Sequence, residues 1–169
     1  PDTMERLIEA RKRLVFDEFF LFIMGMQYQK EKRTRQENRF VMEHPEFVED
    51  LIQKLPYELT GAQRRALHDV TENMQGPYAM QRLIQGDVGS GKTILAFLAM
   101  AWCAQNGYQS AIMAPTEVLA QQHYETFQKL CEQFGLHFPV ILLTGSMTAK
   151  QKRSAYERLE LYENALIVG

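Results

Sequence analysis

One glycine-rich segment constrains this chain more than any other. Residues 86–93 run Gly-Asp-Val-Gly-Ser-Gly-Lys-Thr and fit the pattern G-x-x-x-x-G-K-T. Glycines let the backbone turn its N–H groups inward at the start of a helix, and such a loop is an anion site. The apolar run 82–85 predicts a buried strand before the loop, and the pattern that begins at Thr93 predicts a helix after it. Strand, loop and helix in this order predict a nucleotide phosphate site.

The two last residues of this loop have separate expected roles. Lys92 is predicted to reach the β- and γ-phosphates as a positive charge, and the Thr93 hydroxyl is predicted to hold Mg²⁺. The alternative is an ordinary glycine-rich turn between a strand and a helix. Such turns rarely place Lys-Thr at the first helical positions, so we favour phosphate binding. The predicted nucleotide-binding loop comprises Gly86, Asp87, Val88, Gly89, Ser90, Gly91, Lys92 and Thr93.

Length and composition limit the class of protein. A chain of 169 residues suffices for one domain with an appendage, and a net charge of −2 gives no overall basic field for nucleic acid. Cys103 and Cys131 lack metal-ligand spacing and are expected to be buried, in a reducing compartment. No stretch is apolar enough to span a membrane. The chain begins at Pro1 and ends on an apolar strand pattern, so we expect a piece of a longer protein.

Helical and strand patterns alternate along most of the chain. Helices are predicted at about 46–54, 60–74, 93–105, 117–134 and 148–161, and strands at 82–85, 110–114, 140–143 and 165–168. This alternation predicts an α/β fold with a parallel sheet and right-handed crossovers. Ligands collect at the carboxyl ends of such strands, so we expect the loops 86–93, 115–117 and 144–146 to share one rim.

The N-terminal residues predict a long helix from about Met4 to Arg39, or two helices nearly in line. Its middle, residues 16–26, is apolar almost all round and needs a cover, so we expect self-association or a poorly ordered end. The following part is basic. Its basic residues are Lys30, Lys32, Arg33, Arg35 and Arg39. They form either a surface that faces DNA or a solvated helical face, and we favour the latter.

Two further features each have two interpretations. Gln63 either closes a capping box with Thr60 or pairs with the edge of an adenine base. The loops 115–117 and 144–146 combine a threonine hydroxyl with a following helix, which suits either a capped connection or a contact with nucleic-acid phosphates. The sequence alone leaves both choices open. The DNA-binding candidates are Pro115, Thr116, Glu117, Thr144, Gly145 and Ser146.

Several segments together resemble a known family. Residues 86–93 resemble motif I of the superfamily 2 helicases, and residues 114–123 (Ala-Pro-Thr-Glu-Val-Leu-Ala-Gln-Gln-His) resemble their motif Ia. Residues 143–146 and 166–169 resemble the following Ib-type segment and the start of the next motif. The pair of motifs I and Ia is similar to the RecG-like branch, which also contains the transcription-repair coupling factor Mfd. Residues 9–19 and 55–63 favour RecG, since they resemble its connector helix and its lead into motif I.

The resemblance implies a RecA-like motor domain of an ATP-driven translocase that remodels branched DNA, by fork regression and branch migration of Holliday junctions. It implies ATP and Mg²⁺ as cofactors and a bacterial cytoplasmic location. Residues 1–44 would be a helical connector from a wedge domain, and residues 45–169 the first part of the motor. Gln63 would contact the adenine, with Tyr57 or Phe47 stacking on the base. Thr116 and Thr144 would grip the DNA backbone.

The resemblance also indicates what this stretch lacks. The acidic Walker B motif and the second motor domain with its arginine fingers lie outside residues 1–169, and phosphoryl transfer depends on such groups. We therefore expect this chain alone to be inactive in hydrolysis and unwinding. The alternatives are the motor of Mfd, a non-motor P-loop NTPase, and an interaction fragment that dimerises through residues 16–26 and binds no nucleotide.

Overall fold

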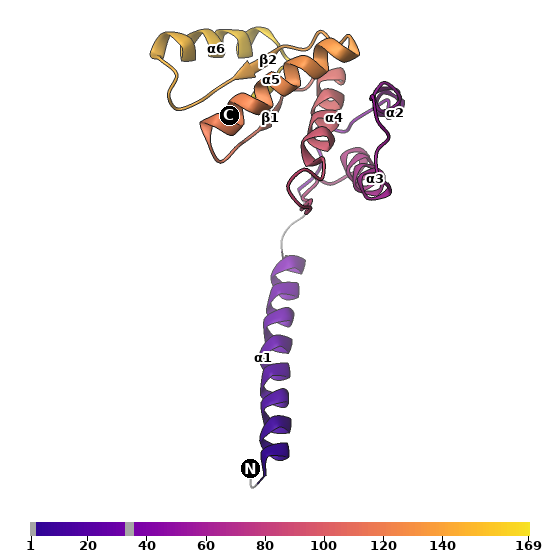
Figure 1. The fold of residues 1–169 in the computed structure, drawn as a ribbon, viewed down its shortest axis with the longest axis vertical. Helices are drawn as coiled ribbons and strands as arrows, with labels where there is room; N and C mark the ends of the chain where they lie inside the picture. Colours follow the sequence, from indigo (N-terminus) through magenta and orange to yellow (C-terminus); the bar gives the residue numbers. More distant parts are fainter. Residues whose placement is uncertain (1–2, 33–35) are drawn as a thin grey trace. The chain divides into compact units, whose positions relative to one another are not determined.

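The computed structural model describes residues 3–32 and 36–169, without the side chains of residues 30–32. It divides into two compact units, residues 1–36 and residues 37–169, each described here by itself (Figure 1). The predicted basic positions Lys30, Lys32, Arg33 and Arg35 lie outside the described side chains. The assignment of residues 1–44 to a connector from another domain stays a prediction.

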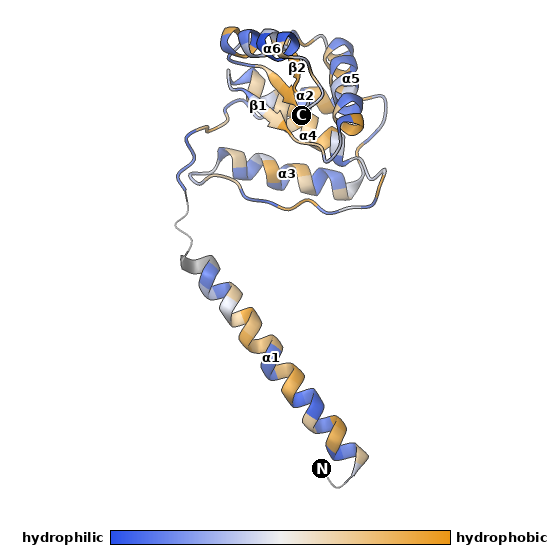
Figure 2. Ribbon diagram, turned by 90° about the vertical axis from the view of Figure 1, so that its left-hand side faces the viewer, coloured by the Kyte–Doolittle hydropathy of each residue, from blue (hydrophilic) through white to orange (hydrophobic). Residues whose placement is uncertain are grey.

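The first unit is the helix α1, Met4–Lys32. Hydrophobic and hydrophilic residues alternate along its ribbon in Figure 2. The apolar residues within 14–24 are exposed; Phe16 is 63% exposed and its ring lies 6.0 Å from that of Phe20. The prediction that the helix runs to Arg39 is wrong. The chain is extended at Glu37 and Asn38, because the Asn38 side chain donates to the carbonyl groups of Met74 and Gly76 at 3.0 and 2.9 Å.

The second unit contains a three-stranded parallel sheet in the order β1-β3-β2. Its strands are β1 Ser110–Ile112, β2 Val140–Leu142 and β3 Leu166–Val168, with Ser110 and Val140 both in register with Leu166. The helices are α2 Glu46–Gln53, α3 Gly61–Gln75, α4 Lys92–Gln105, α5 Glu117–Phe134 and α6 Ala149–Leu161. The predicted α/β alternation is confirmed, and no helix in the described ranges is both long and apolar enough to cross a membrane.

Successive side chains of a strand point to opposite faces of the sheet, so the helices pack in two layers, one on each face. Val140, Leu166 and Val168 belong to the main core, where α4 and α5 meet through the rings of Phe97 and Phe127, 5.2 Å apart and edge to face. Ile141 points to the other side, into a small cluster with Ala155 of α6. Helices α4 and α5 therefore cover one face of the sheet and α6 the other.

Helix α4 is apolar on nearly all sides, since every residue from Ile94 to Ala104 is apolar. Its residues Phe97, Leu98, Ala101 and Trp102 are fully buried, and it contacts α2, α3, β1 and β3. A helix of this kind is stable only when neighbours cover it all round. The core thus forms around the helix that follows the glycine-rich loop.

The expected strand at residues 82–85 does not form in the described part of the chain. These residues have no regular secondary structure and pair with no strand, and Leu83 is 87% exposed. Side chains hold the segment instead: Arg82 Nη1 lies 2.9 Å from Asp69 Oδ2, and Arg82 Nη2 donates to Asn73 Oδ1 at 3.0 Å. The segment therefore lies along α3 rather than in the β1-β3-β2 sheet.

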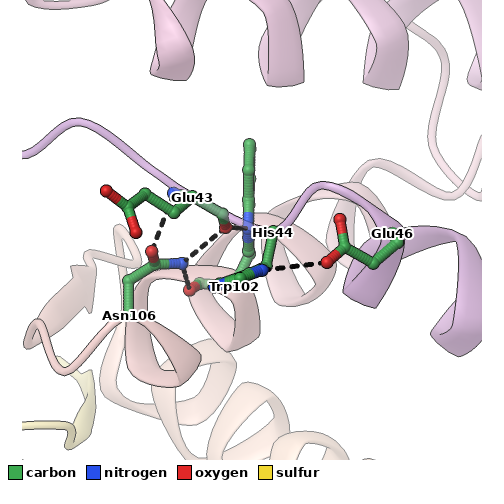
Figure 3. Close-up of polar contacts among 5 residues, drawn as sticks. All are labelled: Glu43, His44, Glu46, Trp102 and Asn106. Atoms are coloured by element: carbon green, nitrogen blue, oxygen red, sulfur yellow. Dashed lines mark hydrogen bonds and ion pairs between the residues drawn. The ribbon is translucent and has the colours of Figure 1, made fainter.

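The C-terminal end of α4 is bonded to the segment before α2 (Figure 3). Trp102 Nε1 donates to the Glu43 carbonyl at 2.7 Å, and the Asn106 amide accepts from the Glu43 N–H at 2.8 Å and donates to the Glu43 carbonyl at 3.2 Å. His44 follows with φ +59°, and its Nδ1 lies 2.9 Å from Glu46 Oε1. This Glu43 clamp fixes the left-handed bend that precedes α2.

We expect loss of the Glu43 clamp to destabilise the second unit. Asn106→Ala leaves the Glu43 N–H without this partner, and Trp102→Phe removes one donor while most of the ring packing stays. Each change should lower the free energy of unfolding by about 1–2 kcal/mol in urea titrations. Gln133→Ala, at an exposed position of α5, is the control and should change it by less than about 0.5 kcal/mol. Equal effects at all three positions would contradict the clamp.

Both thiols should react slowly at neutral pH. Burial raises the pKa of Cys103 and of Cys131 to about 11, so both stay protonated while an unfolded thiol already ionises near pH 9. Alkylation by iodoacetamide at pH 8 should therefore be much slower than for the urea-unfolded chain. The raised pKa also means that the free energy of unfolding declines as pH rises from about 9, where the unfolded thiols ionise, to about 11, where the folded ones do. The Cys103→Ala, Cys131→Ala double variant should show a weaker decline.

Candidate functional site

The glycine-rich loop presents an uncapped helix end. Gly91 is the N-cap of α4 with φ +83°, Gly89 has φ +82°, and no side chain caps the first turn. Helices α3, α5 and α6 differ, since Thr60, Thr116 and Thr148 cap them through their hydroxyls. The first N–H groups of α4 are therefore left for an anion, at the positive end of the helix dipole.

The loop has no room for side chains where it folds most tightly. A Cβ on Gly86 would lie 2.6 Å from Ser90 Oγ, and a Cβ on Gly91 would collide with the Gln63 amide nitrogen. The positive φ of Gly91 adds a backbone reason, because L-residues rarely adopt it. Both glycines therefore keep the turn narrow enough for backbone groups to surround a small anion.

The Lys92 ammonium lies inside this turn. Its Nζ donates to the carbonyl groups of Gly86 and Asp87 at 2.7 and 2.6 Å, and Ser90 Oγ lies 3.4 Å away. An uncapped helix start and a cation meet at one place here, which is the combination that a nucleotide phosphate needs. Lys92 would exchange its carbonyl partners for phosphate oxygens, and charge-assisted bonds of that kind are the stronger ones.

Thr93 begins the buried part of α4 and is itself half-buried. Its role as a Mg²⁺ ligand stays a prediction. Mg²⁺ in such sites takes few protein ligands and completes its shell with phosphate oxygens and water. Consistent with this, no group of three or more His, Cys, Asp or Glu side chains within residues 3–32 and 36–169 could hold a metal ion by itself.

Gln63 connects the start of α3 with the loop. Its Oε1 accepts from the Thr60 N–H at 2.7 Å, while the Thr60 hydroxyl accepts from the Gln63 N–H at 3.2 Å, so the capping box is confirmed. Its Nε2 donates to the Ser90 carbonyl at 2.8 Å, a contact that the sequence did not indicate. The amide thus stands beside the phosphate loop, and pairing with adenine stays a proposal.

The two candidates for base stacking differ in exposure. Phe47 packs against the main core, whereas the Tyr57 ring is 51% exposed. Stacking on a base needs a free ring face, which Tyr57 offers. The role of either residue remains a prediction.

The loops 115–117 and 144–146 meet, as expected for loops at one rim. Glu117 Oε1 accepts from the Ser146 N–H at 2.7 Å, although the residues are 29 positions apart. Hydrogen bonding by the Ser146 hydroxyl first, and by its N–H second, lowers the pKa of Glu117. Among the described residues, no hydrogen bond or ion pair joins this pair of loops to the phosphate loop.

We call the joined loops 115–117 and 144–146 the paired rim, and three hydroxyl groups lie on it. Thr116 Oγ1 accepts from the Leu119 N–H at 3.3 Å, so the capped connection is confirmed. A hydroxyl that accepts one bond still has a proton to donate, so capping leaves Thr116 able to bind a phosphate oxygen. Thr144 Oγ1 lies 3.4 Å from Ser146 Oγ, and Lys152 Nζ donates to the Gly145 carbonyl at 3.1 Å. The last contact also was not evident from the sequence.

Comparison with known proteins places this geometry in a family. The family model of the DEAD/DEAH box helicases matches residues 60–168. The chain belongs to the DEAD/DEAH box helicase family. The match spans the Thr60–Gln63 capping box, the glycine-rich loop 86–93 and the loops 115–117 and 144–146.

The helicase relatives extend the match to the N-terminal residues. The chain is 43% identical to the ATP-dependent DNA helicase RecG of Synechocystis sp. over 171 residues, covering all of this chain and 20% of that protein. It is 41% identical to RecG of Bacillus subtilis over 170 residues, covering all of this chain and 25% of that protein. The chain therefore spans about a fifth to a quarter of these relatives, and the expected resemblance to RecG is confirmed.

A solved structure shows the same fold. The chain matches the structure described as RecG bound to a three-way DNA junction with a TM-score of 0.79 and 34% identity, over all of this chain and 23% of that one. The predicted RecA-like helicase fold is confirmed. Because the matches to RecG include residues 1–59, outside the family model, they favour the RecG branch over a non-motor P-loop NTPase.

Gly91→Ala should damage the phosphate loop more than its backbone strain alone explains. The new Cβ would displace the Gln63 amide, so both stability and affinity for Mg²⁺-ADP should fall. Gly107→Ala is the matched control, since Gly107 has φ +80° and nothing within 4 Å of the new Cβ. The control should cost about 1–2 kcal/mol in unfolding free energy and leave nucleotide affinity unchanged. Equal losses in both variants would show that the Gln63 contact does not matter.

Proposed function

We propose that this chain is the ATP-binding part of an ATP-dependent DNA helicase that remodels branched DNA in recombination and repair. The observation that carries the proposal is the Lys92 ammonium inside a glycine cradle at the uncapped start of α4. Two similarities support it: the RecG relatives are ATP-dependent DNA helicases, and the similar solved structure is of RecG bound to a three-way DNA junction. Fork regression and branch migration of Holliday junctions are the specific activities proposed.

In this proposal the residues divide the work. Lys92 and the N–H groups of residues 89–93 bind the β- and γ-phosphates, Thr93 contributes its hydroxyl to Mg²⁺, and Gln63 orients the adenine. ATP with Mg²⁺ supplies the transferable phosphoryl group. Thr116 and Thr144 hold the DNA backbone through hydroxyl groups and the α5 N-terminus, which carry no sequence information and suit movement along DNA.

The remaining expectations extend this proposal to the whole protein. We place it in the bacterial cytoplasm, with forks and Holliday junctions as partners. We propose that this chain alone binds nucleotide but does not hydrolyse it, because phosphoryl transfer needs further groups that orient the attacking water and neutralise charge. We also propose that α1 promotes self-association, since its apolar residues 14–24 are exposed. Light scattering at high concentration tests this last point.

The first test is calorimetric titration of this chain with Mg²⁺-ADP. Lys92→Ala should weaken binding about 10- to 100-fold, as expected for loss of charge-assisted hydrogen bonds. Lys129→Ala, an exposed lysine on α5, is the charge-matched control and should bind as the wild type does. In the full-length protein, Lys92→Ala should abolish ATP hydrolysis while DNA binding persists. Unchanged nucleotide affinity in Lys92→Ala would refute the assignment of the loop as a phosphate site.

A further inference from the structure

We infer that Glu117 is a positioning residue that locks the loop 144–146 to the start of α5, so that the two loops grip DNA as one unit. The inference rests on the proposed DNA role of these loops. It assigns Glu117 a task other than contact with DNA: its carboxylate faces the protein backbone rather than a partner.

One peptide unit is held from both sides. The bond between Gly145 and Ser146 carries the Gly145 carbonyl and the Ser146 N–H. The carbonyl accepts from Lys152 Nζ at 3.1 Å, and the N–H donates to Glu117 Oε1 at 2.7 Å. A carboxylate on the donor side and an ammonium on the acceptor side match the dipole of the peptide. This arrangement therefore favours one orientation of the unit and opposes a flip.

The site favours glycine at position 145. A Cβ there would stand 3.0 Å from Glu117 Oε1, tighter than nine in ten real Cβ contacts, so the carboxylate would have to move by a few tenths of an ångström. Glycine lets the carboxylate approach, but it also leaves the backbone freer than any other residue would. Glu117 and Lys152 therefore supply the restraint that the missing side chain does not.

The locked peptide sets the positions of the neighbouring hydroxyl groups. Thr144 and Ser146 flank Gly145, with their hydroxyl oxygens 3.4 Å apart, and Thr116 directly precedes Glu117. The Glu117–Ser146 bond thus joins the α5 N-terminus to the second loop. Without it, each loop would have to be ordered separately when DNA binds, and the entropy of that ordering would weaken binding.

The sign of the effect separates positioning from simple charge. A carboxylate near DNA phosphates repels them, so removal of its charge alone should strengthen DNA binding. Loss of the hydrogen bond between Glu117 and the Ser146 N–H should instead weaken DNA binding. Glu117→Gln keeps an oxygen that can accept from the Ser146 N–H and removes only the charge, whereas Glu117→Ala removes both. The two variants therefore move in opposite directions if the bond matters.

The experiment uses the full-length protein with a synthetic fork DNA. Fluorescence anisotropy gives the affinity for DNA, and ATPase assays give the DNA concentration for half-maximal stimulation and the KM for ATP. Glu117→Ala should weaken DNA binding and raise the half-maximal DNA concentration about fivefold or more, while the KM for ATP stays unchanged. Glu117→Gln should bind DNA as well as the wild type or better. Glu157→Ala, an exposed carboxylate on α6, is the control.

A second measurement tests the lock without DNA. Amide exchange of Ser146 by NMR should be about tenfold faster in Glu117→Ala than in the wild type, and unchanged in Glu157→Ala. If Glu117→Ala binds DNA as tightly as Glu117→Gln, or if Ser146 exchange is unaffected, this inference is overturned. If the wild type binds no DNA, the proposed function fails and the inference fails with it.

Discussion

The burial of α4 on all sides is the constraint on which the rest of the second unit depends. A helix with apolar residues all round cannot lie at a surface, so α2, α3, α5 and the sheet enclose it. Both of its ends are then fixed. The glycine-rich loop leads into its N-terminus, and the Glu43 clamp holds its C-terminus. Core packing thereby sets the position of the nucleotide site relative to the chain that precedes α2.

The helices differ in how the N–H groups of their first turns are capped. Threonine hydroxyls satisfy the first turns of α3, α5 and α6, as helix stability favours. Helix α4 begins instead with a left-handed glycine and an open first turn, which costs stability and leaves donors for phosphate. Helix α2 also lacks a side-chain cap, so the missing cap alone does not identify a site. The open first turn of α4 favours the proposed phosphate site because the Lys92 ammonium lies beside it.

Local patterns predicted most elements, and non-local contacts produced the exceptions. The capping box of Thr60 and Gln63, one of the two interpretations that the sequence offered, depends on residues three positions apart, and the structure confirms it. The strand expected at residues 82–85 failed because a strand needs a partner for its backbone groups, and an apolar run does not supply one. The helix expected to reach Arg39 failed because Asn38 finds backbone acceptors at the end of α3.

The sequence by itself determined the α/β alternation and the family, and it predicted a phosphate role for the glycine-rich loop, since all three depend on residue types at short spacing. Tertiary structure decided which groups meet across long spacing. Gln63 reaches Ser90 because α3 and α4 pack together, and Glu117 reaches Ser146 because β3 lies between β1 and β2 and brings their following loops to one edge. A capping bond spans three residues and is visible in the sequence. A bond between loops depends on sheet order and register, which only the assembled core establishes.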